Sequence, residues 1–524
     1  MMMDSTNFWY GINRFVYFPL MLLLLIIWLP LSCRLEVSAA LLHGRRNVLL
    51  IIADDGGFEM GVYGNNRCQT PHLDALAAQS LVFSRARTSV SSCSPSSRAA
   101  LLTGLPSHEN GLYGLHHDVH HYNSFENVRS LPAILRENGI RTGIIGKKHV
   151  GPASAYIFDY EQTEENNSIM QVGRNITRIK PFFLYVAFHD PHRCDHENPF
   201  YGHFCDKFGN GEPGYGHIPD WTPVHYKPED VLLPYFVPDT EAAREDVASQ
   251  YTTISRLDQG VGLVIEEIRK ASMADDTLII FSSDNGISFP NGRTNMYEPG
   301  LAVPMFIKSP YDESRRGEMT DIQANLLDIV PTVLDWFDID YPEYHILKPS
   351  QPIKLTGKSL LPLLNDEKGV ESDTFFGSHI THEITMNYPM RAIIQEERYK
   401  LIHNLNAPGT PFPIDQDFYL SPTFLDMLNR TLNGRPLRWI KELKDYYFRE
   451  EWEMFDLKTD PKECVNVHRK KKYKEKFSEL KEKLFQWQKS TYDPWLCAPH
   501  GVLLENAEGP FCAPLHNRKY IKEL

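Results

Sequence analysis

A cysteine within a run of small and hydroxyl residues is the feature of this chain that most directly suggests chemistry. Cys93 lies in the stretch TSVSSCSPSSRAALLTG at 88–104, where Pro95 and Arg98 lead into a short apolar helix closed at Gly104. A helix N-terminus carries unpaired backbone N–H groups and a partial positive charge, to which an arginine adds a full charge, so an anion is favoured there. Cys93 is therefore a candidate nucleophile beside an anion site. A buried or disulfide-bonded cysteine is the plainer interpretation of this residue taken alone.

Polar residues that can bind a metal ion, an anion or a proton follow four apolar segments of the chain. They are Asp54 and Asp55, Lys147 and His149, His189 and His192, and Asp284 and Asn285. Because ligands of open α/β sheets bind outside the carboxyl ends of the strands, we expect the four groups to converge. The acidic pairs offer oxygen ligands that suit calcium or magnesium, and the crowded carboxylates would repel one another without a cation. Helix capping by one or two of the aspartates is the alternative.

Basic side chains form the second half of the candidate site. They are Arg98, Lys147, His149, His192 and Arg293. Such a set can bind a tetrahedral anion, neutralise the charge that builds on it and protonate a leaving group. With a metal ion and a nucleophile, it indicates transfer of a phosphoryl or sulfuryl group, and the residues alone do not separate the two. Since a thiol is an unusual nucleophile beside a hard cation, we expect Cys93 to be modified before it acts.

The elements that must position these residues alternate between strands and helices. Continuous apolar runs, typical of strands buried on both faces of a parallel sheet, occur at 47–53, 142–146, 181–188 and 277–281. Helical patterns lie between them, from Pro71, at 131–138 and at 241–273. This alternation predicts an α/β domain with a large, mostly parallel sheet flanked by helices.

The pattern changes from about residue 374 onward. The predicted elements there are two hairpin strands, a third strand and an amphipathic helix, at 391–396, 399–404, 452–457 and 474–489. A chain of 524 residues is too long for one core. We therefore expect a catalytic domain at 40–373 and a smaller C-terminal α+β domain at 374–524.

Charge and the N-terminal segment bear on partners and compartment. The net charge of −13 excludes a broad basic face, so we expect no nucleic-acid partner. The apolar run at 15–31, preceded by Arg14 and followed by small residues up to Ala39, predicts a secretory signal peptide at 1–39. A retained signal anchor is the alternative, because the run is about as long as a short membrane span. No second such run follows, so we expect no stable membrane anchor.

Sequons and cysteines agree with the secretory route. Three N-glycosylation sequons occur, at Asn166, Asn175 and Asn429. Among the eight cysteines, Cys194 with Cys205 and Cys497 with Cys512 enclose short loops that disulfides could close. Cys33 lies in the signal region, and Cys68, Cys93 and Cys464 remain. At least one of these three should be free, and Cys93 is our choice.

Four motifs, in this order along the chain, resemble those of the sulfatase family. They are ADDGGFE from Ala53, GLHHDVHH from Gly114, GKKHVGP from Gly146 and FHDPHRC from Phe188. The resemblance extends over nearly the whole chain after the signal, up to the segment EMFDL at 453–457 and the Asp460-Pro461 pair. Within the family the chain is most similar to the lysosomal sulfamidases.

The resemblance implies a fold, a cofactor and a mechanism. The fold would be the alkaline-phosphatase-like fold of sulfatases, with the smaller C-terminal domain. The formylglycine-generating enzyme would oxidise Cys93 to formylglycine, whose hydrate attacks sulfur and then expels sulfate. Calcium would be bound by Asp54, Asp55, Asp284, Asn285 and the formylglycine at Cys93. Arg98 and Lys147 would stabilise the hydrate with His149 nearby, and His192 and Arg293 would bind the sulfate and assist the leaving group.

The resemblance also implies a substrate and a location. The substrate would be the N-linked sulfate of glucosamine at the non-reducing end of heparan sulfate, degraded in the lysosome by a homodimer. His382, Glu383 and Arg391 are candidates for contacts with the sugar. An O-sulfatase of the same family, a catalytically silent sulfatase-like protein that binds glycans, and a phosphatase or phosphodiesterase of the same superfold are the alternatives.

Two features depart from the family pattern. The modification motif of the family is Cys-x-Pro-x-Arg, whereas one additional residue stands between Cys93 and Arg98 here. The addition would impair recognition by the modifying enzyme, or rotate Arg98 by about 100° if it lies within the helix. The link from Asn175 to the strand at Pro181 is also shorter than a parallel crossover needs.

Overall fold

The computed structural model describes residues 46–92, 94–117, 119–163, 181–194, 201–346, 352–366, 373–407, 409–506 and 509–515. Several predictions lie outside the described residues: the signal peptide at 1–39, Cys93, Asn166, Asn175 and the link before Pro181.

An eight-stranded sheet forms the centre of the catalytic domain. Its strand order is β5 (Tyr160–Thr163), β4 (Arg141–Gly146), β6 (Phe182–Ala187), β1 (Asn47–Ala53), β7 (Thr277–Ser283), β8 (Met305–Lys308), β2 (Leu81–Phe83) and β9 (Met319–Thr320). The pairings are parallel except for those of β8 with β7 and β2. The prediction of a large, mostly parallel sheet is confirmed, and β1, β4, β6 and β7 are the four predicted strands.

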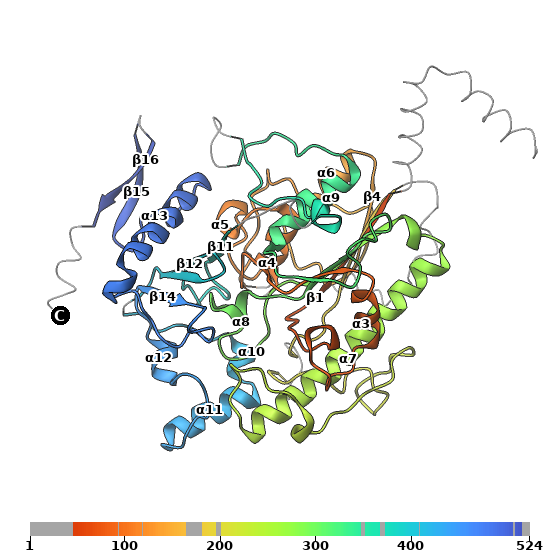
Figure 1. Ribbon diagram of the computed structural model, residues 1–524, viewed down its shortest axis with the longest axis horizontal. Helices are drawn as coiled ribbons and strands as arrows, with labels where there is room; N and C mark the ends of the chain where they lie inside the picture. Colours follow the sequence, from red (N-terminus) through yellow and green to blue (C-terminus); the bar gives the residue numbers. More distant parts are fainter. Residues whose placement is uncertain are drawn as a thin grey trace, which may run out of the picture.

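Helices cover both faces of this sheet, as Figure 1 shows. Alternate residues of β1 point to opposite faces, as in any strand. Val48, Leu50 and Ile52 join the core beneath α4 (Pro95–Thr103), α6 (Leu131–Glu137) and α9 (Ile329–Phe337). Leu49, Ile51 and Ala53 join the core beneath α3 (Pro71–Ala77) and α7 (Glu241–Lys270). All seven residues of β1 are buried, which explains its continuous apolar run.

A four-stranded antiparallel sheet lies at the centre of the C-terminal domain. Its order is β11 (Thr374–His379), β12 (Met390–Gln395), β13 (Tyr399–Asn404) and β14 (Trp452–Asp456). Helix α13 (Lys474–Ser490) packs on one face of it through Leu480, Leu484 and Trp487. The predicted hairpin, third strand and amphipathic helix are therefore confirmed. The first strand begins at Thr374, and we keep this position as the proposed domain boundary.

Shorter elements complete this domain. They are α10 (Gln416–Tyr419), α11 (Pro422–Leu432), α12 (Leu443–Tyr447), β15 (Gly501–Asn506) and β16 (Gly509–Pro514). The predicted disulfide between Cys497 and Cys512 is present and ties the β15–β16 hairpin to the segment after α13. Asn429, the described sequon, is exposed on α11.

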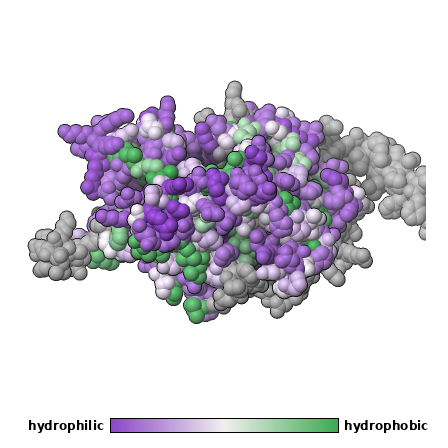
Figure 2. All heavy atoms as spheres, turned by 90° about the horizontal axis from the view of Figure 1, so that it is seen from below, coloured by the Kyte–Doolittle hydropathy of each residue, from purple (hydrophilic) through white to green (hydrophobic). Residues whose placement is uncertain are grey.

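The surface and the helices bear on membrane association. Figure 2 shows one face of the molecule, on which hydrophilic residues predominate and hydrophobic ones gather in small groups. Among the described helices, none combines the length and the apolar character needed to cross a membrane.

Helix α5 (Ser107–Asn110) carries a buried carboxyl whose titration links stability to pH. Glu109 is 3% exposed, and burial raises its pKa to about 8. An unfolded glutamate has a pKa of about 4.3, so between the two values the unfolded state releases a proton that the folded state keeps. Between these two pKa values, each increase of one pH unit lowers the free energy of unfolding by up to about 1.4 kcal/mol.

We expect Glu109→Gln to raise the melting temperature at pH 7.5 and to change it little at pH 4.5. The amide cannot ionise, so the variant avoids the cost that the glutamate incurs above its unfolded pKa. Differential scanning calorimetry at both pH values measures the effect, with Glu313→Gln, whose side chain is 70% exposed, as control. Equal loss of stability at both pH values would contradict the expectation.

Candidate active site

The register of the sheet brings the acidic residues together. Ala53 of β1 pairs with Ser283 of β7, so the residues that follow them, Asp54 and Asp284, leave the sheet side by side. The second residues after the two strands, Asp55 and Asn285, are also in contact. The Asn285 side-chain amide donates to Asp55 Oδ1 over 2.7 Å. All four of these acidic and amide residues are buried. The predicted convergence of the oxygen ligands is therefore present in the structure.

The electrostatics of this group favour a bound cation. Burial, and then the neighbouring Asp54, raise the pKa of Asp284 to about 7. Burial alone would raise the pKa of Asp54 too, but Lys147, His192 and Arg98 hold it well below its usual range. Ligand atoms of Asp54, Asp55 and His192 lie within 4.8 Å of one another. Three carboxylates and an amide oxygen suit calcium, which would relieve the repulsion that raises the pKa of Asp284.

Arg98 lies in the first turn of α4 and joins two of the carboxylates. Its Nε donates to Asp284 Oδ2 over 3.0 Å, and its Nη2 lies 3.6 Å from Asp54 Oδ2. Its Nη1 donates to Tyr185 Oη over 2.9 Å and to the Lys147 carbonyl over 3.1 Å. The additional residue before Arg98 does not rotate the guanidinium away from the site.

Ser94 is a site residue that the sequence analysis missed. It stands four residues before Arg98, and its hydroxyl donates to Asp54 Oδ1 over 2.8 Å while accepting from Lys147 Nζ over 2.9 Å. Its backbone N–H donates to Asn285 Oδ1 over 3.3 Å. Ser94 immediately precedes α4, and no local pattern singles it out among the serines of this stretch.

Lys147 and His149 extend the site from the end of β4. Lys147 forms an ion pair with Asp54. The ring of His149 stacks on that of His117, with centroids 4.3 Å apart. Burial, and then Lys147, lower the pKa of His149 well below its usual range, so its imidazole is neutral. A neutral imidazole offers one donor and one acceptor rather than a positive charge. His117 belongs to a motif that the sequence analysis quoted without giving this residue a role.

His192 and Arg293 lie together on the other side of Asp55. Arg293 Nη1 is 2.9 Å from His192 Nε2 and also contacts Asp55. His192 Nδ1 lies 2.6 Å from the Arg193 carbonyl. We assign the proton to Nδ1, which leaves Nε2 as the acceptor from Arg293. His189, on the same segment, is exposed.

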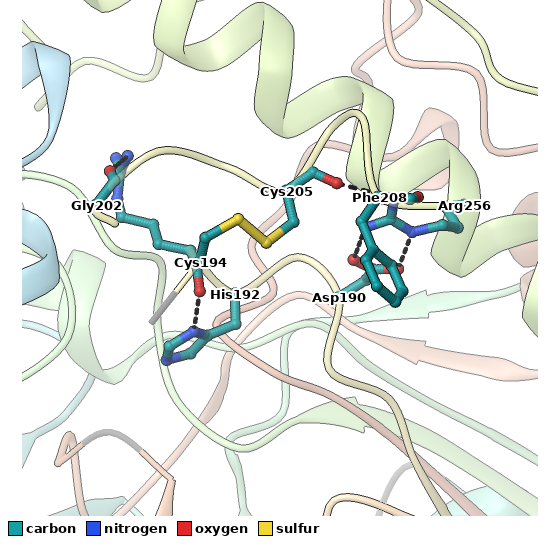
Figure 3. Close-up of a disulfide and its surroundings, with 8 residues drawn as sticks. Asp190, His192, Cys194, Gly202, Cys205, Phe208 and Arg256 are labelled. Atoms are coloured by element: carbon teal, nitrogen blue, oxygen red, sulfur yellow. Dashed lines mark hydrogen bonds and ion pairs between the residues drawn. A yellow bond between two sulfur atoms is a disulfide. The ribbon is translucent and has the colours of Figure 1, made fainter. Parts of the chain in front are cut away.

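A disulfide and an ion pair hold the segment that carries His192 (Figure 3). The predicted bond between Cys194 and Cys205 closes the loop two residues after His192. Arg256 of α7 binds Asp190 through two contacts of 2.6 and 2.7 Å, and donates to the Cys205 carbonyl over 2.9 Å. The histidine is therefore fixed on both sides along the chain.

Two aspartates of the C-terminal domain were also missed. Asp415 and Asp417 flank the start of α10 and contact Arg293, at 2.8 Å from Nη2 in the case of Asp415 Oδ1. Burial raises the pKa of Asp415 well above its usual value. Burial would raise the pKa of Asp417 too, but Arg293 holds it well below its usual range. The two acidic residues interrupt an apolar stretch, which was the only local signal.

The three residues predicted to contact the sugar, His382, Glu383 and Arg391, differ in burial and in their contacts. His382 is buried, and burial followed by the charge of Arg293 lowers its pKa well below its usual range. Glu383 is half-buried on the same loop. Arg391 contradicts the prediction, because it is fully buried and its guanidinium is occupied by Asp493 at 2.6 and 2.8 Å and by two backbone carbonyls. Its role is structural.

Removing Arg98 should make the stability of the protein depend on calcium. In Arg98→Gln, Asp54 and Asp284 lose a buried counter-charge, a change that costs roughly 3–5 kcal/mol. Calcium would replace part of that charge, so the loss of melting temperature should be larger in EDTA than in excess calcium. Arg244→Gln, which breaks an exposed pair with Asp239, is the control and should cost at most about 1 kcal/mol. A deficit that calcium does not change would contradict the assignment of the cation site.

Comparisons with known proteins place this geometry in a family. The sulfatase family model matches residues 46–339. Human N-sulphoglucosamine sulphohydrolase is 57% identical over 93% of this chain and 99% of its own length. Mouse iduronate 2-sulfatase is 27% identical over 50% of this chain and 59% of its own.

Solved structures show the same fold. A 2-O GAG sulfatase is similar with a TM-score of 0.60 and 17% identity, over 86% of this chain and 93% of that one. The phosphonate monoester hydrolase of Agrobacterium radiobacter is similar with a TM-score of 0.53 and 18% identity, over 90% of this chain and the whole of that one. Identities this low support the fold alone. The family match and the human relative show more: this chain belongs to the sulfatase family and is a sulfatase.

Proposed function

We propose that this sulfatase hydrolyses the N-linked sulfate of glucosamine at the non-reducing end of heparan sulfate. The identity of 57% with human N-sulphoglucosamine sulphohydrolase, over nearly the whole length of that enzyme, carries the proposal. The buried site supports it, since basic side chains surround a carboxylate cluster where a sulfate and a cation can bind side by side.

The proposal includes two groups that chemistry at this site needs. Asp54, Asp55, Asp284 and Asn285 would hold a calcium ion, which would supply a hard Lewis acid beside the sulfate. Cys93, once oxidised to formylglycine by the formylglycine-generating enzyme, would supply a hydrated aldehyde as the nucleophile and a further ligand for calcium.

The basic residues of the chain then bind and orient the sulfate. Arg98 and Lys147, fixed by Asp284 and Asp54, neutralise the negative charge that builds on the sulfate oxygens. The neutral imidazole of His149 takes part through hydrogen bonds.

Departure of the sugar nitrogen depends on the other side of the site. Arg293 binds a sulfate oxygen, and His192 Nε2, once protonated, gives its proton to the leaving nitrogen. The disulfide and the Arg256–Asp190 pair keep His192 in place for this step.

The cellular context of the enzyme is part of the same proposal. The predicted signal peptide, the exposed Asn429 sequon and the two disulfides support maturation in the secretory pathway and delivery to the lysosome. Glycosylation at Asn166 and Asn175, assembly as a homodimer and contacts of His382 and Glu383 with the sugar remain proposals.

The experiment that tests the function compares N-sulfoglucosamine with glucosamine 6-O-sulfate, using protein from a eukaryotic secretory host. We expect sulfate release from the first compound and little from the second. Cys93→Ala should lose at least about 1,000-fold in kcat/KM while its melting temperature stays close to that of the parent. Preference for the O-sulfate would support the O-sulfatase alternative, and binding of heparan oligosaccharides without sulfate release would support the silent binder.

A second prediction concerns the additional residue before Arg98. Deleting Ser97 restores the Cys-x-Pro-x-Arg spacing, so the modifying enzyme should convert a larger fraction of Cys93. The mass spectrum of the peptide that carries Cys93 measures that fraction, because formylglycine is lighter than cysteine. Ser94→Ala, which keeps the spacing of the parent, is the control. Equal conversion in the parent and the deletion variant would show that the additional residue is tolerated.

A further inference from the structure

One carboxylate oxygen beside His192 has no hydrogen-bond donor among the described residues. Asp417 Oδ1 accepts from the Phe418 N–H over 3.0 Å and contacts Arg293. Asp417 Oδ2 is buried, accepts no hydrogen bond within the described part of the chain, and lies 3.9 Å from His192 Nε2. Buried carboxylate oxygens are nearly always satisfied, because leaving one without a donor is costly. A donor from a ligand would satisfy this one.

The side chain of His382 also has polar atoms that lack hydrogen-bond partners among the described residues. His382 is 5% exposed, and neither of its ring nitrogens has a hydrogen-bond partner among the described residues. The charges of Arg293, Asp417 and His192 all act on it, so it belongs to the same part of the site. Asp417 and His382, two buried side chains near Arg293, therefore have polar atoms without a hydrogen-bond partner among the described residues. This points to a bound ligand rather than to a structural ion pair alone.

The chemistry of sulfamate cleavage supplies a suitable donor. When the S–N bond breaks, its electron pair goes to nitrogen, and R–NH–SO₃⁻ with H₂O gives R–NH₃⁺ with SO₄²⁻. The leaving group thus becomes a cation with three N–H donors. An O-sulfate gives a neutral alcohol with a single donor, so a carboxylate beside the leaving group favours the amine over the alcohol.

We propose that Asp417 Oδ2 binds the amino group of the leaving glucosamine and makes the site selective for N-linked over O-linked sulfate. The inference rests on the proposed function and names the part of the site that selects the substrate. Because Oδ2 lies close to His192 Nε2, the nitrogen that receives a proton from His192 is within reach of the carboxylate as its charge develops.

Asp415 provides a matched comparison. It also contacts Arg293 and also accepts from the Phe418 N–H, at 3.2 Å, but no contact of Asp415 with His192 is found among the described residues. The pKa of Asp415 is raised by burial and that of Asp417 is held low by Arg293, so Asp415→Asn replaces a neutral carboxyl, whereas Asp417→Asn removes a negative charge. Either asparagine retains an oxygen for the backbone contact. Only the change at Asp417 removes the oxygen that faces His192.

The test uses the mature, calcium-loaded protein. The ratio of kcat/KM for N-sulfoglucosamine to kcat/KM for an aryl sulfate should fall by about tenfold or more in Asp417→Asn and stay within about twofold in Asp415→Asn. Asp417→Glu, which keeps the charge, should restore most of the ratio. If the two asparagine variants change the ratio equally, Asp417 only positions Arg293 and the proposal is overturned.

A binding measurement separates this inference from the proposed function. Calorimetry with glucosamine, the ammonium product, should show affinity in the parent that falls by about tenfold in Asp417→Asn, whereas binding of N-acetylglucosamine, which has no ammonium, should not change with the charge at this position. This holds even for protein that fails to release sulfate, so loss of the proposed function would be seen separately. Glucosamine affinity that is equal in the parent and in Asp417→Asn would overturn the inference.

Discussion

Compensation of buried negative charge is the constraint on which the site depends. Parallel pairing of β1 with β7 places Asp54 and Asp284 next to each other inside the protein, where an unpaired carboxylate is costly. Lys147 at the end of β4 and Arg98 at the start of α4 both contact this pair. The carboxylates that would bind a cation therefore also hold the start of α4 and the end of β4 in place, through Arg98 and Lys147. A cation bound at this cluster would therefore be coupled to the stability of the fold through these residues.

The site is shared between the two domains. Arg293 follows β7 in the catalytic domain, but two of its carboxylate partners, Asp415 and Asp417, come from the C-terminal domain. His108 of α5 adds a buried link, with its ring nitrogens 2.9 Å from Ser378 Oγ of β11 and 2.8 Å from Thr491 Oγ1. Burial lowers the pKa of His108 to about 3, so this link stays neutral at mildly acidic pH. The C-terminal domain thus helps to position Arg293, through Asp415 and Asp417, in addition to packing against the larger domain.

The sequence predicted the long strands, the residues that follow them, the main elements of the C-terminal domain and the two disulfides, but few of the charge pairs that complete the site. Four apolar runs marked β1, β4, β6 and β7, and the strand ends then had to meet; strands of two to four residues, such as β8 and β9, carry too short a pattern to detect. Arg391 was a candidate sugar contact only through the resemblance. Its partner Asp493 stands 102 residues later, and no local pattern marks such a pair. Asp417 was missed for the same reason, since its role depends on Arg293, 124 residues away. Long-range pairing of charges is a property of the folded chain that spacing does not encode.

Ser94 shows how one additional residue is absorbed. Arg98 is held in the site by two carboxylates and a tyrosine hydroxyl, although one additional residue precedes it. The residue four positions before Arg98 is then Ser94, and its hydroxyl lies between Lys147 and Asp54. Ser94 takes a positive φ of 49°, a conformation that non-glycine residues adopt at a cost and that the surrounding contacts must maintain. Lys147 is thus engaged by the Ser94 hydroxyl as well as by Asp54, and the additional residue meets the charged groups of the site at this serine.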